Sequence, residues 1–133
     1  MTLVDSNVLI DVLTDDPQWR EWSEAHILAA AAGGSLAINP IIYAELSVAF
    51  RSAAALDRAL RDLDLQRPAL PYEAAFHAAQ AFLAYRRRDG AKRSPLPDFY
   101  IGAHAQIEGW QLLTRDAARY RTYFPKVALL CPE

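Results

Sequence analysis

Apolar residues recur along this chain in two patterns: short continuous runs and helically spaced sets. The short runs have the length of buried strands and lie at residues 2–5, 35–38, 110–114 and 127–131, with a further candidate at 65–67. The helically spaced sets lie at residues 7–15, 17–32, 41–54, 55–63, 72–88 and 97–109, and a short helix is expected to start at Asp116. The two patterns alternate, which predicts about five strands and about seven helices.

The alternation also predicts how the elements assemble. Strands that are apolar on both sides and separated by helices form a parallel sheet covered on both faces. Turn signals agree with this reading, since Gly33 and Gly34 close one helix while Asn39 and Pro40 open another. We therefore expect an α/β fold, a three-layer α/β/α arrangement around a short parallel sheet. Sites in such sheets form where the carboxyl ends of strands turn into helices.

Composition and length fit one ordinary folded domain. The chain has 133 residues, of which 53% are hydrophobic and 23% charged, so we expect a single domain over residues 1–133. No apolar run approaches the roughly 20 residues that a membrane span needs, and Met1 is not followed by a basic leader. We therefore expect a cytoplasmic protein with no membrane association. Cys131 is the only cysteine, which excludes an internal disulfide.

Charge is distributed unevenly along the chain. Residues 1–50 carry a net charge of −6 and residues 51–133 one of +4, which together give the overall −2. The overall charge does not suggest a nucleic-acid-binding protein, but its distribution permits a local basic surface.

Four acidic residues stand at or near the predicted turns. Asp5 closes the first strand and Asp116 follows the strand at 110–114, while Asp98 and Glu45 lie in the first and second turns of helices. Converging carboxylates repel one another unless a cation is present. An all-oxygen cluster suits Mg²⁺ or Mn²⁺, which activate water for hydrolysis of a phosphodiester. Taken singly, however, each aspartate also fits a helix cap, and Glu45 also fits an exposed helix edge.

Four motifs in order carry a family resemblance: DSNVLIDVL at 5–13, NPIIYAEL at 39–46, PDFYIGAHA at 97–105 and GWQLLTRDAARYRTYFP at 109–125. They resemble the PIN domain and, more closely, the VapC toxins of bacterial type II toxin–antitoxin pairs. The resemblance implies a Mg²⁺- or Mn²⁺-dependent endoribonuclease whose metal-binding and catalytic acids are Asp5, Glu45, Asp98 and Asp116. It also points to Asn7 and Thr114 as polar residues beside the site, with Asn7 holding the Asp5 turn and the Thr114 hydroxyl bonding a carboxylate or a metal-bound water. It further implies a VapB-like antitoxin partner and a toxin homodimer.

Basic residues flank two of the acids and are candidates for binding the RNA substrate. They are Arg86, Arg87, Arg88 and Arg93 before Asp98, and Arg115, Arg119 and Arg121 around Asp116. Arginine binds phosphate through its planar fork, although a solvated helix end and loop would explain the same residues.

Two other functions remain open at this point. The first is a PIN-domain nuclease that processes RNA or acts on DNA without a toxin role, which should not arrest growth when expressed alone. The second is a non-catalytic Mg²⁺-binding regulatory module. A receiver-like module places its acids early in the chain, whereas here they extend to Asp116 and one of them, Glu45, lies inside a predicted helix.

Overall fold

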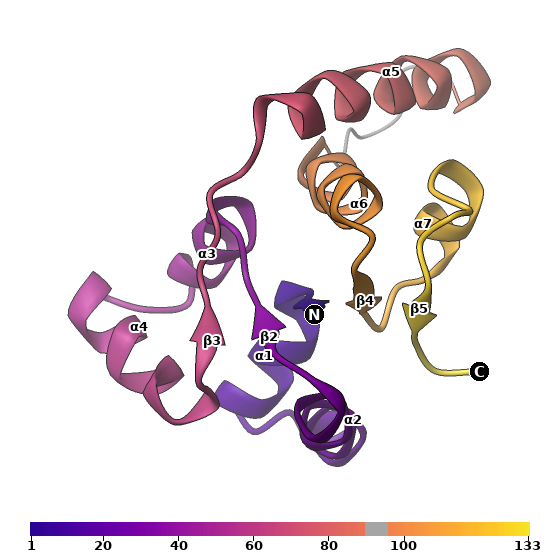
Figure 1. Cartoon of the computed structure of the whole chain (residues 1–133). Helices are drawn as coiled ribbons and strands as arrows, with labels where there is room; N and C mark the ends of the chain where they lie inside the picture. Colours follow the sequence, from indigo (N-terminus) through magenta and orange to yellow (C-terminus); the bar gives the residue numbers. More distant parts are fainter. Residues whose placement is uncertain (90–95) are drawn as a thin grey trace.

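The structure, a computed structural model, describes residues 1–89 and 96–133. These residues contain seven α-helices, one short 3₁₀ helix and five strands (Figure 1). In chain order they are β1 (Thr2–Val4), α1 (Ser6–Leu13), α2 (Arg20–Gly33), β2 (Leu36–Ala37), α3 (Pro40–Ser47), α4 (Ala53–Leu60), η1 (Arg61–Leu63), β3 (Leu65–Gln66), α5 (Tyr72–Asp89), α6 (Leu96–Glu108), β4 (Gln111–Leu113), α7 (Ala118–Tyr123) and β5 (Leu129–Leu130).

The strands form one parallel sheet in the order β3-β2-β1-β4-β5. β1 lies in the middle, where Leu3 is in register with Ala37 of β2 on one side and Leu112 of β4 on the other. The predicted α/β class, the parallel sheet and the number of helices and strands are therefore confirmed. Because all strands run the same way, the end of β1 and the end of β4 lie side by side at one edge of the sheet.

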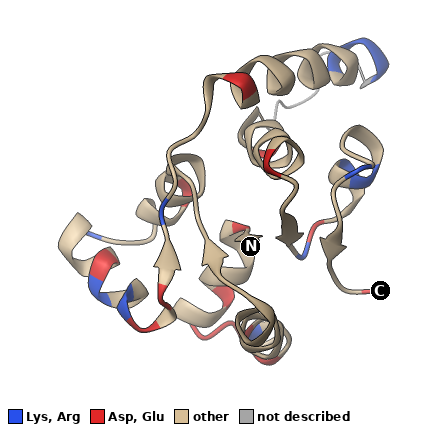
Figure 2. Cartoon of the chain, in the orientation of Figure 1, with Lys and Arg blue, Asp and Glu red and all other residues tan. Residues whose placement is uncertain are grey.

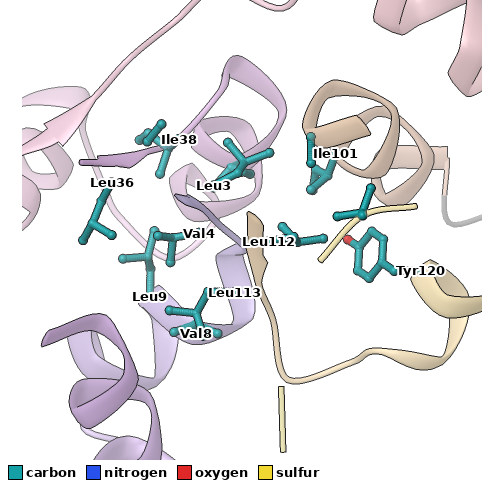
Figure 3. Close-up of a cluster of buried hydrophobic side chains, with 14 of the residues drawn as sticks. Leu3, Val4, Val8, Leu9, Leu36, Ile38, Ile101, Leu112, Leu113 and Tyr120 are labelled. Carbon is teal, nitrogen blue, oxygen red and sulfur yellow. The ribbon is translucent and has the colours of Figure 1, made fainter. Parts of the chain in front are cut away.

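The core occupies both faces of this sheet. All three residues of β1 are buried, which requires cover on both sides because successive side chains point to opposite faces. Figure 3 shows the two sets that result. On one side Val4 lies with Val8, Leu9 and Leu113; on the other, Leu3 lies with Ile38 and Ile101. Helices α5 and α6 pack against each other, and α5 lies on the outer side of α6 (Figure 1).

Several helix boundaries differ from the sequence prediction, and three of them are informative. Helix α2 begins at Arg20 rather than Pro17, because the Asp16 carboxylate accepts the backbone N–H groups of Gln18 and Trp19 in a turn before the helix. Helix α3 ends at Ser47 rather than near residue 54, and the next helix starts after Ser52, whose hydroxyl accepts the N–H of Ala55.

The third boundary is that of α7. This helix begins at Ala118, two residues after Asp116, so Asp116 does not start it. Within the described part of the chain, no helix is both long enough and apolar enough to cross a membrane.

Gly102 offers a test of the packing between α6 and the C-terminal segment. A Cβ at this position would overlap the ring of Phe124, which is only 2% exposed and has no room to move away. Gly102→Ala should therefore lower the free energy of unfolding by about 1–3 kcal/mol in urea denaturation. The control is Gly33→Ala, whose Cβ would meet no atom within 4 Å and which should be neutral or slightly stabilising. Equal stability of the two variants would contradict this packing.

Candidate functional site

Asp5 lies where β1 turns into α1, and it is the N-cap of that helix. Its Oδ1 accepts the backbone N–H of Ser6 at 2.8 Å. Its Oδ2 accepts the hydroxyl of Thr114 at 2.8 Å and the hydroxyl of Tyr120 at 3.1 Å. The residue is only 3% exposed, so this carboxylate is held in a fixed orientation away from bulk water.

Burial is the main electrostatic fact about Asp5. The pKa of Asp5 is raised from 3.8 to about 7. Burial is the largest cause; the hydrogen bond from Thr114 lowers the pKa, the charges of Asp98 and Glu45 raise it, and the hydrogen bond from the Ser6 N–H lowers it. The charged form of this carboxylate is therefore energetically unfavourable at neutral pH. The site therefore favours any cation that can reach it.

Glu45 projects from α3 toward the same place. The hydroxyl of Ser6 donates to its Oε1 at 2.8 Å, so the residue next to Asp5 also holds Glu45. Burial raises the pKa of Glu45, and the charge of Asp98 adds to this effect while the Ser6 hydrogen bond opposes it. The sequence left open an exposed helix edge for Glu45, but this side chain is half-buried and engaged.

Asp98 lies in the first turn of α6 and is linked to Asp5 through one hydroxyl. Tyr120 lies within hydrogen-bond distance of both, 3.4 Å from Asp98 Oδ1 and 3.1 Å from Asp5 Oδ2. On its other side Asp98 accepts Nη1 of Arg119 at 2.7 Å. Burial raises the pKa of Asp98, the Arg119 guanidinium lowers it, and the charge of Asp116 raises it again.

Asp116 is the most exposed of the four acids. Its backbone N–H donates to the Thr114 hydroxyl at 3.1 Å, which fixes the turn after β4. Its influence on the pKa of Asp98 means that its charge lies close to that residue. The structure thus brings all four predicted acids into one electrostatic neighbourhood at the carboxyl edge of the sheet.

Asn7 and Thr114 lie where the family resemblance implied. Thr114 is fully buried and bonds Asp5 directly. The Asn7 amide lies 3.5 Å from Asp5 Oδ2 and 3.4 Å from the Thr114 hydroxyl, and its Oδ1 accepts the N–H of Arg115 at 3.2 Å. Together these contacts tie the start of α1 to the end of β4.

Two residues at the site were not singled out by sequence reasoning: Ser6 and Tyr120. Each makes its contact through the fold, since Tyr120 reaches Asp5 across 115 positions of sequence. Burial and the charges of Asp5 and Asp98 raise the pKa of Tyr120 well above its usual value, so its hydroxyl keeps its proton and can donate. The only sequence signal for Tyr120 is its place in the motif at 109–125, four residues after Asp116.

Arg115 does not approach the acids with its guanidinium. Its Nε and Nη2 donate to the buried carboxylate of Asp11 at 2.6 and 3.0 Å, and the guanidinium lies 5.0 Å from the centre of the Trp19 ring. Asp11 also accepts the hydroxyl of Ser23 at 2.6 Å. Arg115 therefore has a structural partner, and phosphate binding by this side chain would have to compete with Asp11.

Three more of the predicted basic residues lie at the end of α5. Arg86, Arg87 and Arg88 are exposed there, with Arg86 5.8 Å from the centre of the Phe82 ring. Figure 2 shows this basic end of α5 on the same side of the molecule as the basic residues of α7. Arg93 lies outside the described residues.

A hollow of about 270 Å³ separates the end of α5 from α7. Its lining consists of two arginines, a threonine, an alanine and two tyrosines, namely Arg88, Arg119, Thr122, Ala118, Tyr85 and Tyr123. Arg119 belongs both to this hollow and to the acid cluster, because it also pairs with Asp98. The hollow is therefore a basic recess that adjoins Asp98 through Arg119.

The acids fit a hard divalent ion in chemistry. All four are carboxylates, the ligands that Mg²⁺ and Mn²⁺ prefer, and three of them have raised pKa values that a cation would lower. Across residues 1–89 and 96–133, however, no three Asp, Glu, His or Cys side chains are placed to hold one ion together. The donor set therefore suits the metal, while Arg119 supplies the cation nearest to Asp98.

A sequence model of the PIN domain matches residues 2–125 of the chain. The chain therefore belongs to the PIN domain family, and this membership implies nuclease activity. The family predicted from the sequence motifs is confirmed. No curated protein matches the chain in sequence.

Several solved structures share the fold. VapBC2 from Rickettsia felis, bound to a DNA fragment from its promoter, aligns with a TM-score of 0.74 at 16% identity, over 99% of this chain and 98% of that one. FitAcB from Neisseria gonorrhoeae aligns with a TM-score of 0.68 at 23% identity, over 98% and 96%. A toxin–antitoxin complex from Klebsiella pneumoniae aligns with a TM-score of 0.66 at 25% identity, over 96% of each chain. These neighbours agree with the resemblance to VapC toxins.

The raised pKa of Asp5 makes a prediction about the metal-free protein. Between pH 3.8 and about 7 the folded state holds a proton on Asp5 that the unfolded state has lost, so stability falls as the pH rises through this window. Asp5→Asn removes this dependence. Relative to the native protein, the variant should gain on the order of 2 kcal/mol in free energy of unfolding on going from pH 5 to pH 8. Urea denaturation in a chelator at both pH values measures it, and an unchanged difference would show that Asp5 is not held as described.

Proposed function

We propose that this protein is a Mg²⁺- or Mn²⁺-dependent endoribonuclease and the toxin of a VapBC-type toxin–antitoxin pair, acting in the cytoplasm. The observation that carries the proposal is the gathering of four carboxylates at one sheet edge, where Asp5 is buried and has a raised pKa. Family membership supports the nuclease activity. The toxin role draws on solved neighbours whose names identify VapBC and toxin–antitoxin assemblies.

In this proposal Asp5, Glu45, Asp98 and Asp116 would hold the metal. A bound Mg²⁺ or Mn²⁺ supplies a water of lowered pKa and neutralises charge on the phosphate under attack. The chain's own contribution is orientation. Thr114, Tyr120 and the Ser6 N–H donate to Asp5, and the Ser6 hydroxyl donates to Glu45, so these two carboxylates are held in defined orientations.

The RNA strand would reach the acids across the basic end of α5. Arg86, Arg87 and Arg88 lie there, and Arg88 lines the recess that Arg119 shares with the acid cluster. The phosphates of a single strand need such cations along their path. Arg93 stays a prediction for the same role, and Arg115 is the weakest member of the set because it is paired with Asp11.

Loss of an acid should separate this proposal from its alternatives. Asp98→Asn should lower RNA cleavage in Mg²⁺ or Mn²⁺ by at least about a hundredfold, because it removes a charge from the metal-binding set. The matched control is Asp62→Asn, an exposed aspartate of η1 away from the cluster, which should cleave normally. When each variant is expressed alone in bacteria, Asp98→Asn should be harmless and Asp62→Asn should arrest growth. Full cleavage by purified Asp98→Asn would contradict the nuclease mechanism, and cleavage by the native protein without growth arrest would contradict the toxin role.

The proposal includes a homodimer and a VapB-like antitoxin that covers the site. An exposed apolar stripe on α5 supports the dimer: Tyr72, Phe76 and Leu83 are 95%, 63% and 45% exposed and lie on one face of the helix. Such a stripe on a water-facing helix is typical of an interface. A second copy fits because α5 carries Glu73 at its start and three arginines at its end, so antiparallel pairing would place opposite charges together.

Substitution within the stripe tests the dimer. Phe76→Glu places two like charges in the interface and should convert the protein to a monomer, as measured by sedimentation equilibrium. Glu21→Gln, an exposed change at the start of α2, should leave the mass unchanged. If native protein and Phe76→Glu have the same mass, α5 is not the dimer interface.

A further inference from the structure

Arg119 occupies the border between the acid cluster and the basic recess. Its Nη1 donates to Asp98 Oδ2 at 2.7 Å, and its guanidinium lies 5.7 Å from the centre of the Tyr85 ring. Among the ion pairs of residues 1–89 and 96–133, this pair is the one that involves any of the four acids. Arg119 therefore supplies a positive charge to the cluster when no metal ion is present.

A divalent ion and the Arg119 guanidinium compete for the carboxylate of Asp98. The guanidinium is always charged, so an ion that ligates Asp98 would repel it at short range. The Arg119 side chain is 27% exposed and the Asp98 side chain 23% exposed, so the pair is not locked in the core. An arriving ion can therefore displace the guanidinium without unfolding any helix.

The recess offers the displaced side chain a second position. Arg119 lines it together with Arg88, and none of its described lining residues is acidic. Two guanidinium groups match the oxygens of a phosphodiester, which arginine binds through paired N–H donors. A volume of about 270 Å³ leaves room for such a group.

We propose that Arg119 is an exchangeable counter-cation that pairs with Asp98 in the metal-free protein and binds a backbone phosphate of the RNA in the α5–α7 recess once a divalent ion takes Asp98. Metal and RNA then bind cooperatively: the ion takes Asp98 away from Arg119, and the RNA phosphate gives Arg119 a new partner. The inference rests on the proposed nuclease function and adds the phosphate site and the coupling.

The first experiment measures Mn²⁺ binding without RNA by isothermal titration calorimetry. Arg119→Gln removes the competitor for Asp98, so the variant should bind Mn²⁺ about tenfold more tightly than the native protein. The matched control is Arg67→Gln, which removes an arginine paired at 3.0 Å with exposed Asp57 and should bind Mn²⁺ normally. Arg88→Gln should also bind Mn²⁺ normally, because Arg88 lines the recess without an ion pair to the acids.

The second experiment measures binding of a short labelled single-stranded RNA by fluorescence anisotropy, in Ca²⁺, with a gel to verify that the RNA stays intact. Arg119→Gln should lose about tenfold in affinity and reduce the slope of log K against log salt by about 0.7, the value for one phosphate contact on a single strand. Arg88→Gln should lose affinity similarly. Arg119→Lys keeps the charge and should restore the slope. In a chelator, the native protein and Arg119→Gln should differ much less.

The possible outcomes distinguish failure of the Arg119 exchange from failure of the proposed nuclease function. Unchanged or weaker Mn²⁺ binding by Arg119→Gln would overturn the exchange, and so would RNA binding equal to that of the native protein in Ca²⁺. Either result, with normal cleavage by the native protein, would leave the nuclease function standing. If Arg119→Gln fails to fold, Arg88→Gln and Arg119→Lys still decide, because unchanged RNA affinity in the first and an unrestored slope in the second would contradict the phosphate site. Absence of Mn²⁺ binding by the native protein would instead overturn the proposed function, and this inference with it.

Discussion

The buried negative charge of Asp5 is the constraint on which the rest of the site depends. A carboxylate that is 3% exposed loses most of its hydration, and here Glu45 and Asp98 add further negative charge nearby. The chain offsets this cost with fixed donors: one N–H from Ser6, hydroxyls from Thr114 and Tyr120, and the guanidinium that Arg119 gives to Asp98. These donors lower the cost without removing it, since the pKa of Asp5 is still about 7. A cation would remove it.

The sheet topology creates this concentration of charge. With β1 between β2 and β4, the end of the first strand lies beside the end of a strand more than a hundred residues later. Asp5 and Thr114 meet there, and the helices that follow β2 and precede β4 carry Glu45 and Asp98 to the same edge. The dense packing of the core on both faces of the sheet keeps this edge rigid (Figure 3), so side chains from four helices and from the ends of β1 and β4 can lie close together.

Much of this could be predicted from the sequence, and the limits have physical causes. Apolar runs and helical spacing are local signals, so the class of fold and the parallel sheet followed directly, as did the placement of Asp5 and Asp116 after strands and of Glu45 and Asp98 near helix starts. The end of α3 was predicted less accurately. The break between α3 and α4 depends on Ser52, whose hydroxyl caps the next helix, and the apolar spacing does not show this cap. The engagement of Arg115 with Asp11, and of Tyr120 with Asp5, joins residues more than a hundred positions apart, and no local pattern encodes such a contact.

The central claim is that these carboxylates form a binding site for a divalent ion at the carboxyl edge of the sheet. Anomalous diffraction from crystals soaked in Mn²⁺, collected near the manganese absorption edge, tests it most directly because it locates the ion without reference to activity. The account predicts a peak between α1, α3 and α6, with oxygens of Asp5 and Asp98 among the ligands and the Arg119 guanidinium moved off Asp98. A peak elsewhere, or none at this edge while Arg119 stays on Asp98, would contradict it.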